Sequence, residues 1–520
     1  MPRKIILQIY PDKANDSDYV FKRLLNDVGL RAENINSWEI VKRSIDARKK
    51  RPQIRLEIDV FINDLPKQSI AYRSTLKSGN RDAVHIIGAG PAGYFAALKL
   101  LENGVKPIIY ERGKDVQARR RDLRQIQQFD NVNPDSNYCF GEGGAGTYSD
   151  GKLYTRAKKR GDVQNILKIL QEYGAPADIQ IDAHPHIGSN KLPKIIQAIR
   201  NDIESKGGEI HFNARLTDFI IEKGILKAVV INDLTEVPVN HLILATGHSA
   251  RDIYNLLVNK NVKVEAKPFA MGVRIEHPQA LIDQIQYRQK PRELHLPAAK
   301  YSLSCQINGA GVFSFCMCPG GFIVPAATAP GELVVNGMSL SKRDSPFANS
   351  GMVVSVGPEQ YGREKQLDGL EAVRYQSKVE QAIFQFNESA SQAAPAQGLL
   401  DFLNGRLSQD TCPTSYIPGV YSARLDHLLP EHIVLNLKEG LKQFGKRMKG
   451  YLTKEAQLIG LESRTSAPVR IPRDKESLEH TEIKGLYPCG EGAGYAGGIM
   501  SAAMDGQRVA FKIAQKIIDQ

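Results

Sequence analysis

The sequence predicts an α/β fold, and three observations carry this prediction. An apolar strand over 83–87 runs directly into the glycine motif Gly88-Ala89-Gly90-Pro91-Ala92-Gly93, which opens an alanine-rich helix over 94–102. A second apolar strand, over 107–110, follows that helix. Glycine-rich segments then return in the last part of the chain, over 450–520. Strand, helix and strand in this order form the repeating unit of a parallel sheet.

Composition places the chain among ordinary globular proteins. Hydrophobic residues make up 42% of its 520 residues and charged residues 24%, which excludes disorder, a coiled coil and a fibrous protein. This length predicts about three domains. No apolar run is long enough to cross a membrane, so we expect no membrane partner. Six cysteines without a CxxC pair predict neither a disulfide framework nor a metal site, and they favour a reducing, cytoplasmic setting.

Residues 1–78 are expected to form a separate small module. A strand over 4–10, an amphipathic helix over 18–30 and alternating apolar residues over 54–62 fit a β-α-β-β, ferredoxin-like arrangement. Sixteen basic and ten acidic residues give this module a net charge of +6, which is half of the +12 of the whole chain. The run Arg48-Lys49-Lys50-Arg51 is interpreted as a solvated turn, with contact to an anionic partner as the alternative.

The remaining chain is expected to hold one discontinuous α/β domain with a second domain inserted into it. A polar linker over 74–82 leads into the first part of the α/β domain, over 81–265. A β-rich α+β domain follows over 266–449, and the stretch 450–520 completes the α/β domain, because the glycine motifs return there.

The spacing of the glycines predicts a Rossmann-type dinucleotide site. Gly88 permits the tight turn, Gly90 lets the backbone approach a pyrophosphate, and Gly93 allows close packing of helix on strand. Pro91 and Ala92 then open a helix whose N-terminus faces the phosphates.

Glu111 stands where a ribose-binding acid is expected. It ends the strand over 107–110 and lies 23 residues after Gly88. A glutamate suits an unphosphorylated ribose, because its charge would repel a 2′-phosphate. The nucleotide is therefore FAD or NAD rather than NADP. Arg112 follows and adds a positive charge beside the expected anion.

Three further segments carry a resemblance to a known class. They are 242–247, which reads LILATG, 485–492, which reads GLYPCGEG, and 140–153, which reads FGEGGAGTYSDGKL. Over about 81–260 and 450–520 the chain resembles FAD-dependent oxidoreductases whose nucleotide domain is like that of p-hydroxybenzoate hydroxylase. The loop 140–153 more narrowly resembles a bacterial family described as FAD-dependent dehydrogenases. The resemblance implies FAD as the cofactor and no settled substrate.

By this resemblance, more residues join the FAD site. The pair Gly490-Glu491 stands where the class has a Gly-Asp pair that binds the ribityl chain, and Leu216 matches a backbone position beside adenine. The N-terminus of a last helix would face the flavin N1 and O2, where reduced flavin gathers negative charge. The remaining implied residues are Gly144, Ala145, Gly146, Thr246, Gly247, Gly497, Gly498 and Ile499.

Three side chains are candidates for catalysis. Cys316 and Cys318 would share one face of a strand, and a CxC pair beside a flavin can exchange electrons as a dithiol. Two small core residues on a strand are the alternative interpretation. His277, with Arg274 and Glu276, is a candidate for an anionic-substrate site; the alternative is that Arg274 and Glu276 simply pair on one strand face.

The expected function is that of an FAD-dependent oxidoreductase, a dehydrogenase that transfers a hydride through flavin N5. No second GxGxxG follows a strand elsewhere, so NADH or NADPH would bind only transiently as a reductant. The substrate is expected to be small and anionic. Two alternatives are a flavin-dependent RNA-modifying protein, disfavoured because no basic motif is interleaved with aromatic residues, and a non-catalytic FAD scaffold.

Overall fold

The computed structural model describes residues 2–29, 31–62, 71–79, 82–155, 161–362 and 367–519. The boundary expected at 81 lies outside these residues.

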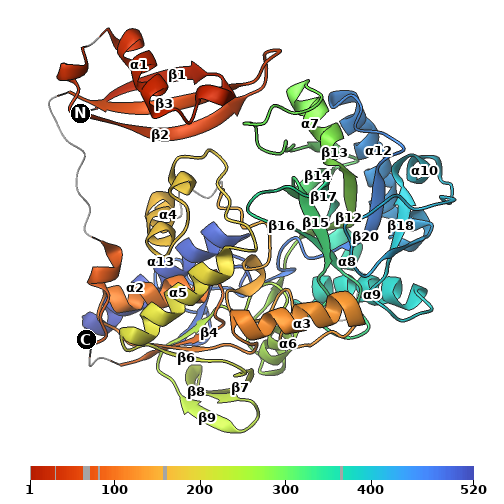
Figure 1. Cartoon of the computed structure of the whole chain (residues 1–520). Coiled ribbons are helices and arrows are strands. Elements are labelled where there is room, and N and C mark those ends of the chain that lie inside the picture. Colours follow the sequence, from red (N-terminus) through yellow and green to blue (C-terminus); the bar gives the residue numbers. More distant parts are fainter. Residues whose placement is uncertain are drawn as a thin grey trace.

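A five-stranded parallel sheet organises the α/β part of the molecule (Figure 1). Its strand order is β22-β10-β4-β5-β6, and neighbouring strands all pair in parallel. The strands are β4 (Val84–Ile87), β5 (Pro107–Tyr110), β6 (Glu209–His211), β10 (Leu242–Leu244) and β22 (Leu486–Pro488). The predicted α/β class with a Rossmann-type sheet is confirmed, and its edge strand β22 comes from near the end of the chain.

Helices cover one face of this sheet and a small meander covers the other. The helical layer contains α2 (Pro91–Glu102), α4 (Val163–Glu172), α5 (Leu192–Ser205) and α13 (Ile499–Ile518), which share one apolar core with β4 and β5. A second core lies beneath α6 (Arg251–Asn259) and the antiparallel strands β7 (Leu216–Glu222), β8 (Ile225–Ile231) and β9 (Thr235–Pro238).

The inserted part is built on a seven-stranded, mainly antiparallel sheet. Its order is β13 (Ser304–Ile307), β14 (Ala310–Cys318), β17 (Phe347–Val356), β12 (Phe269–Pro278), β20 (Gln457–Glu462), β18 (Ala394–Gly398) and β19 (Val420–Ser422). The expected boundary at 449 is corrected by β20, which pairs with β12 and β18. The inserted sheet therefore takes a strand from the stretch that was assigned to the α/β domain.

Smaller elements complete this region. Two short pairs join β11 (Glu265–Ala266) to β21 (Val469–Arg470) and β15 (Gly321–Pro325) to β16 (Val335–Ser339). The other helices are α3 (Val116–Phe129), α7 (Gln279–Tyr287), α8 (Pro358–Tyr361), α9 (Glu371–Phe386), α10 (Leu399–Asn404), α11 (Leu425–Leu428) and α12 (Glu431–Arg447). None of the helices in the described ranges is long and apolar enough to cross a membrane.

The N-terminal module has the expected β-α-β-β order. It consists of β1 (Arg3–Ile9), α1 (Ser17–Val28), β2 (Ser37–Asp46) and β3 (Gln53–Phe61), with β3 central and antiparallel to both neighbours. Figure 1 shows it as a separate layer beyond α4. Arg43 attaches it to the body, since its backbone bonds Ile181 and Ala183 and its guanidinium bonds Asp182 at 2.7 Å. The run 48–51 is the exposed connection between β2 and β3, as predicted.

The packing of α13 on α2 depends on one small residue. Gly506 lies in α13, and a Cβ added there would overlap the backbone of Ala92 in α2. Alanine at this position would force the two helices apart.

We predict that Gly506→Ala lowers the free energy of unfolding by about 1–3 kcal/mol, because overpacking a close helix contact strains both backbones. Urea unfolding followed by circular dichroism measures this. Lys512→Ala is the control, since Lys512 is exposed on the same helix and its replacement should change stability by less than about 0.5 kcal/mol. Equal effects of the two substitutions would contradict this view of the contact.

Candidate functional site

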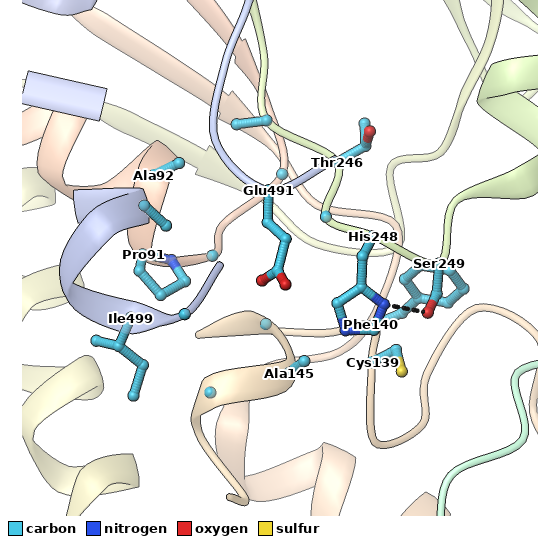
Figure 2. A pocket seen from close by; sticks show the side chains of 18 of the residues that line it. Pro91, Ala92, Cys139, Phe140, Ala145, Thr246, His248, Ser249, Glu491 and Ile499 are labelled. Carbon is cyan, nitrogen blue, oxygen red and sulfur yellow. Dashed lines mark hydrogen bonds between the residues drawn. The ribbon is translucent and has the colours of Figure 1, made fainter. Parts of the chain in front are cut away.

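A cavity of about 330 Å³ lies beyond the carboxyl ends of β4, β5 and β10. This is where ligands bind in open α/β sheets. Most of the residues predicted from the sequence line it, namely Gly88, Gly90, Pro91, Ala92, Glu111, Arg112, Gly144, Ala145, Gly146, Leu216, Thr246, Gly247, Cys316, Glu491, Gly497, Gly498 and Ile499. Figure 2 shows several of them around one open space.

Two positions of the glycine motif, Gly88 and Gly93, have no room for a side chain. Gly88 has a φ of +104°, and a Cβ there would lie 2.5 Å from the Ala245 carbonyl oxygen. A Cβ at Gly93 would overlap the Gly88 carbonyl oxygen, so Gly93 sets the helix–strand distance and does not line the cavity. Gly90 differs, since a Cβ there would meet only Gly144, at 3.9 Å. Its open side faces the cavity at the N-terminus of α2.

Glu111 joins three loops at the rim. One of its carboxylate oxygens accepts a hydrogen bond from the Ala89 N–H at 2.9 Å, and the other accepts from the N–H groups of Gly113 and Gly141 at 2.9 and 3.0 Å. The residue is buried, yet it lines the cavity. Glu111, the residue predicted to bind the ribose, therefore also holds the glycine motif and the loop over 140–151 in place.

Two buried ionisable groups hold the loop over 140–151 from behind. The Arg119 guanidinium is fully buried and donates to four backbone carbonyls, those of Asn137, Gly141, Glu142 and Gly144, at 2.8 to 3.2 Å. The Glu142 carboxylate accepts from the Tyr94 hydroxyl at 2.7 Å and the Val116 N–H at 2.8 Å. Burial raises the pKa of Glu142. These contacts hold the loop so that Gly144 lies close to Gly90 in the cavity lining.

The segment after β22 forms another wall. Gly490 does not line the cavity; its N–H donates to Asp505 at 2.8 Å, and a Cβ there would press on Ala92. The next residue, Glu491, extends its carboxylate into the cavity between Pro91 and His248 (Figure 2). Burial raises the pKa of Glu491 to about 7, against the opposing pull of Lys267. Gly498 then caps α13, so a second helix N-terminus faces the same space.

Sequence reasoning missed several lining residues. His248 and Ser249 follow Thr246-Gly247 directly, and the Ser249 hydroxyl lies 2.8 Å from His248 Nδ1. Burial, with Arg464 nearby, lowers the pKa of His248 to about 4, so its ring is neutral near pH 7. The Ala-Thr-Gly strand end was the signal available for these two. Asn336 and Arg215 line the cavity from distant segments that carry no motif.

A cluster of two thiols and an ammonium group lies at the inserted-sheet side of the cavity. Lys152 and Cys316 both line it, and the Lys152 ammonium lies 3.5 Å from the Cys316 sulfur and 3.9 Å from that of Cys318. Cys318 is buried behind them and does not line the cavity. The two predicted cysteines therefore lie together, although only one of them reaches the open space.

The placement predicted for His277 is wrong. His277 is fully buried on β12 and does not line the cavity. Its Nε2 bonds the Tyr451 carbonyl oxygen at 2.9 Å, and its ring packs against that of Tyr451. Burial lowers its pKa to about 4. Alternation along β12 explains this, because His277 points to the opposite face from Arg274 and Glu276.

Within the described ranges, no group of three or more His, Cys, Asp or Glu side chains is placed to hold a metal ion.

Sequence and structure comparisons found several similar proteins. Residues 268–465 match the family described as FAD-dependent protein, C-terminal domain-like, and residues 1–61 match a domain of unknown function. Among solved structures, a flavin-dependent brominase is 14% identical, with 84% of this chain and 79% of that chain covered and a TM-score of 0.36. A geranylgeranyl bacteriochlorophyll reductase-like protein from Thermoplasma acidophilum is 11% identical, with 84% and 78% covered and a TM-score of 0.35.

A sequence relative decides the family. An uncharacterised protein of Clostridium beijerinckii is 41% identical over 523 residues, which cover 96% of this chain and 97% of the relative. Such identity over nearly the whole of both chains shows common architecture from the N-terminal module to α13. The chain belongs to the same family as this clostridial protein.

Proposed function

We propose that the chain is an FAD-binding oxidoreductase and that FAD occupies the cavity described above. One observation carries the proposal: the N-termini of α2 and α13 open onto a single glycine-lined cavity. A helix N-terminus attracts anions, and a flavin dinucleotide has two anionic groups, the diphosphate at its centre and the reduced ring at one end. The match of residues 268–465 to the FAD-dependent protein family supports the same cofactor.

The residues present suit the separate parts of FAD. Gly90 leaves room for a diphosphate at α2, and Glu111 with Leu216 lines the end suited to adenosine. Glu491 offers a carboxylate to ribityl hydroxyls. Gly497 and Gly498 have no atom within 4 Å of an added Cβ, so a flat ring can approach the α13 N-terminus closely. Bound FAD would supply hydride transfer, while these residues bind and orient it.

Positive charge gathers on the side of the cavity away from the adenosine end. Lys152 lines the cavity, and two cations outside its lining, Lys300 and Arg343, lie nearby; the Arg343 charge acts to lower the pKa of both lysines. Burial and these neighbours lower the pKa of Lys300 to about 8. Asp150 offsets part of this charge by pairing with Arg343 and Lys152. The excess favours a small anionic substrate, with NADH or NADPH binding transiently as the reductant.

Purified protein tests the proposal directly. We expect a yellow protein, or uptake of added FAD with a shift of its visible spectrum, and anaerobic bleaching by NADH or NADPH. A protein that takes up no FAD would refute the proposal. FAD that neither nicotinamide nor dithionite reduces would favour a structural role for the cofactor.

A pair of glycine substitutions separates the cofactor site from the fold. Gly90→Ala should raise the dissociation constant for FAD by roughly tenfold or more, because its methyl group points into the cavity, while thermal stability of the FAD-free protein stays unchanged. Gly93→Ala should lower that stability, since its methyl group would overlap the Gly88 backbone. Fluorescence titration and differential scanning calorimetry measure the two properties. Normal FAD affinity in Gly90→Ala would place the diphosphate elsewhere.

The raised pKa of Glu491 predicts a pH-dependent stability. A carboxyl group with a native pKa of about 7 binds more protons in the folded than in the unfolded chain. Its contribution to the free energy of unfolding therefore falls as the pH rises from 4.5, the ordinary glutamate pKa, towards 7. Glu491→Gln removes this dependence and keeps the side chain's size. We expect the FAD-free variant to gain stability over the native chain between about pH 5 and pH 8. A difference that does not change with pH would show that the carboxyl group is solvated.

A second candidate function concerns an RNA partner. A basic groove of about 970 Å³ lies between the N-terminal module and the inserted part. Its lining includes Arg48, Arg55, Arg288, Lys446, Arg447 and Lys449, against the single acid Asp46. A groove of this charge favours a polyanion.

Fluorescence anisotropy with a labelled single-stranded RNA tests the second candidate. Binding should weaken steeply with salt, and Lys449→Glu should weaken it while leaving FAD binding intact. Lys512→Glu, which reverses an exposed charge on α13 outside the groove lining, is the matched control. Equal losses in the two variants, or no binding at low salt, would reject this candidate.

A further inference from the structure

The segment around Cys316 departs from regular strand geometry. The pairing of β14 with β17 shifts register between Phe315 and Cys318, and Cys316 has a φ of +44°, in the left-handed region that residues other than glycine rarely adopt. In a regular strand, residues i and i+2 share a face but stand well apart. The bulge instead draws the two residues together, and the Cys318 sulfur lies 3.2 Å from the Cys316 carbonyl oxygen.

The two thiols differ in access. Cys316 is half-buried and lines the cavity, whereas Cys318 is fully buried behind it. Neither is in a disulfide. An accessible thiol backed by a buried one is the arrangement of a nucleophilic and a resolving cysteine.

The charges around the pair favour a thiolate at the accessible position. The neighbouring Cys318 thiol is the main cause of a Cys316 pKa well below its ordinary value, against the opposing effects of burial and Asp150. The Lys152 ammonium, 3.5 Å from the Cys316 sulfur, and the buried Arg274 guanidinium lower that pKa further. The neighbouring Cys316 and burial raise the pKa of Cys318. Proton and charge are thus divided unequally between the two sulfurs.

We propose that Cys316 and Cys318 form a redox-active pair that exchanges two electrons with FAD bound in the adjoining cavity. The proposal rests on the proposed FAD site. In the oxidised pair a disulfide joins the two sulfurs. Reduced FAD, when bound, would supply two electrons and one proton and would itself become oxidised. With these the S–S bond breaks, Cys316 leaves as the thiolate held by Lys152, and Cys318 takes the proton. The reverse step balances in the same way.

Peptide mass mapping tests the pair without any need for turnover. Trypsin releases 301–342 as one peptide that holds Cys305, Cys316 and Cys318, so the Cys305→Ser variant serves as the background. After treatment with oxidised glutathione we expect this peptide to lose two hydrogens and to resist iodoacetamide. After dithiothreitol it should take up two labels. Full labelling of both cysteines under oxidising conditions would overturn the proposal, and this assay works with or without FAD.

Anaerobic dithionite titration of the FAD-loaded, oxidised protein tests the electron exchange. The native chain should consume two electron pairs per flavin, and Cys318→Ser should consume one. Cys305→Ser is the matched control and should behave as the native chain, since Cys305 lies on β13 and does not line the cavity. A native chain that holds FAD and a mapped disulfide but consumes a single electron pair would overturn the exchange. A chain that binds no FAD would instead refute the proposed function.

Replacement of the lysine separates a redox role from a packing role. Lys152→Met should move the pH midpoint of Cys316 alkylation upward by about one unit, because the thiolate loses its neighbouring positive charge. An unchanged midpoint would show that the ammonium group does not sustain the thiolate.

Discussion

The close contact of α13 with α2 is the constraint on which the rest of the α/β region depends. Gly506 and the Ala92 backbone set the distance between these helices, and Gly93 and Gly88 set the distance between α2 and β4. Because both contacts exclude a methyl group, the positions of the two helix N-termini follow from backbone geometry rather than from adaptable side chains. The cavity therefore lies between two fixed dipole ends, and a ligand need not order them.

The buried polar groups of the site also fix backbone positions. Glu111 and Arg119 are buried, and their partners are backbone N–H and C=O groups of the loops around the cavity. The buried Glu142 instead ties its loop to the helices, through Tyr94, Val116 and Arg200. A buried ionised group is costly unless its hydrogen bonds are satisfied, so each of these side chains stabilises one particular loop conformation. Glycine provides the close approach, and buried charge provides the rigidity that glycine lacks.

Sequence patterns predicted the local features of this site well and the long-range ones poorly. The GxGxxG spacing located the α2 turn and Glu111, because strand, turn and helix are adjacent in the chain. The same reasoning assigned 457–462 to the wrong unit, because an apolar strand carries no signal for the sheet it joins. His277 failed as a candidate since strand alternation turned it into the core. Cys316 and Cys318 were paired by spacing, but Lys152 reaches them from more than 160 positions away. Such contacts depend on the tertiary fold.

The placement of β20, β22 and α13 has a consequence for the order of synthesis. These three elements lie within 457–518, yet each completes a different part: the inserted sheet, the parallel sheet and the helical layer. The inserted sheet is completed only by 457–462 and the parallel sheet only by 486–488. Both larger sheets therefore wait for strands that are synthesised late in the chain. A chain truncated by even its last helix would keep its N-terminal module and lose the cavity wall.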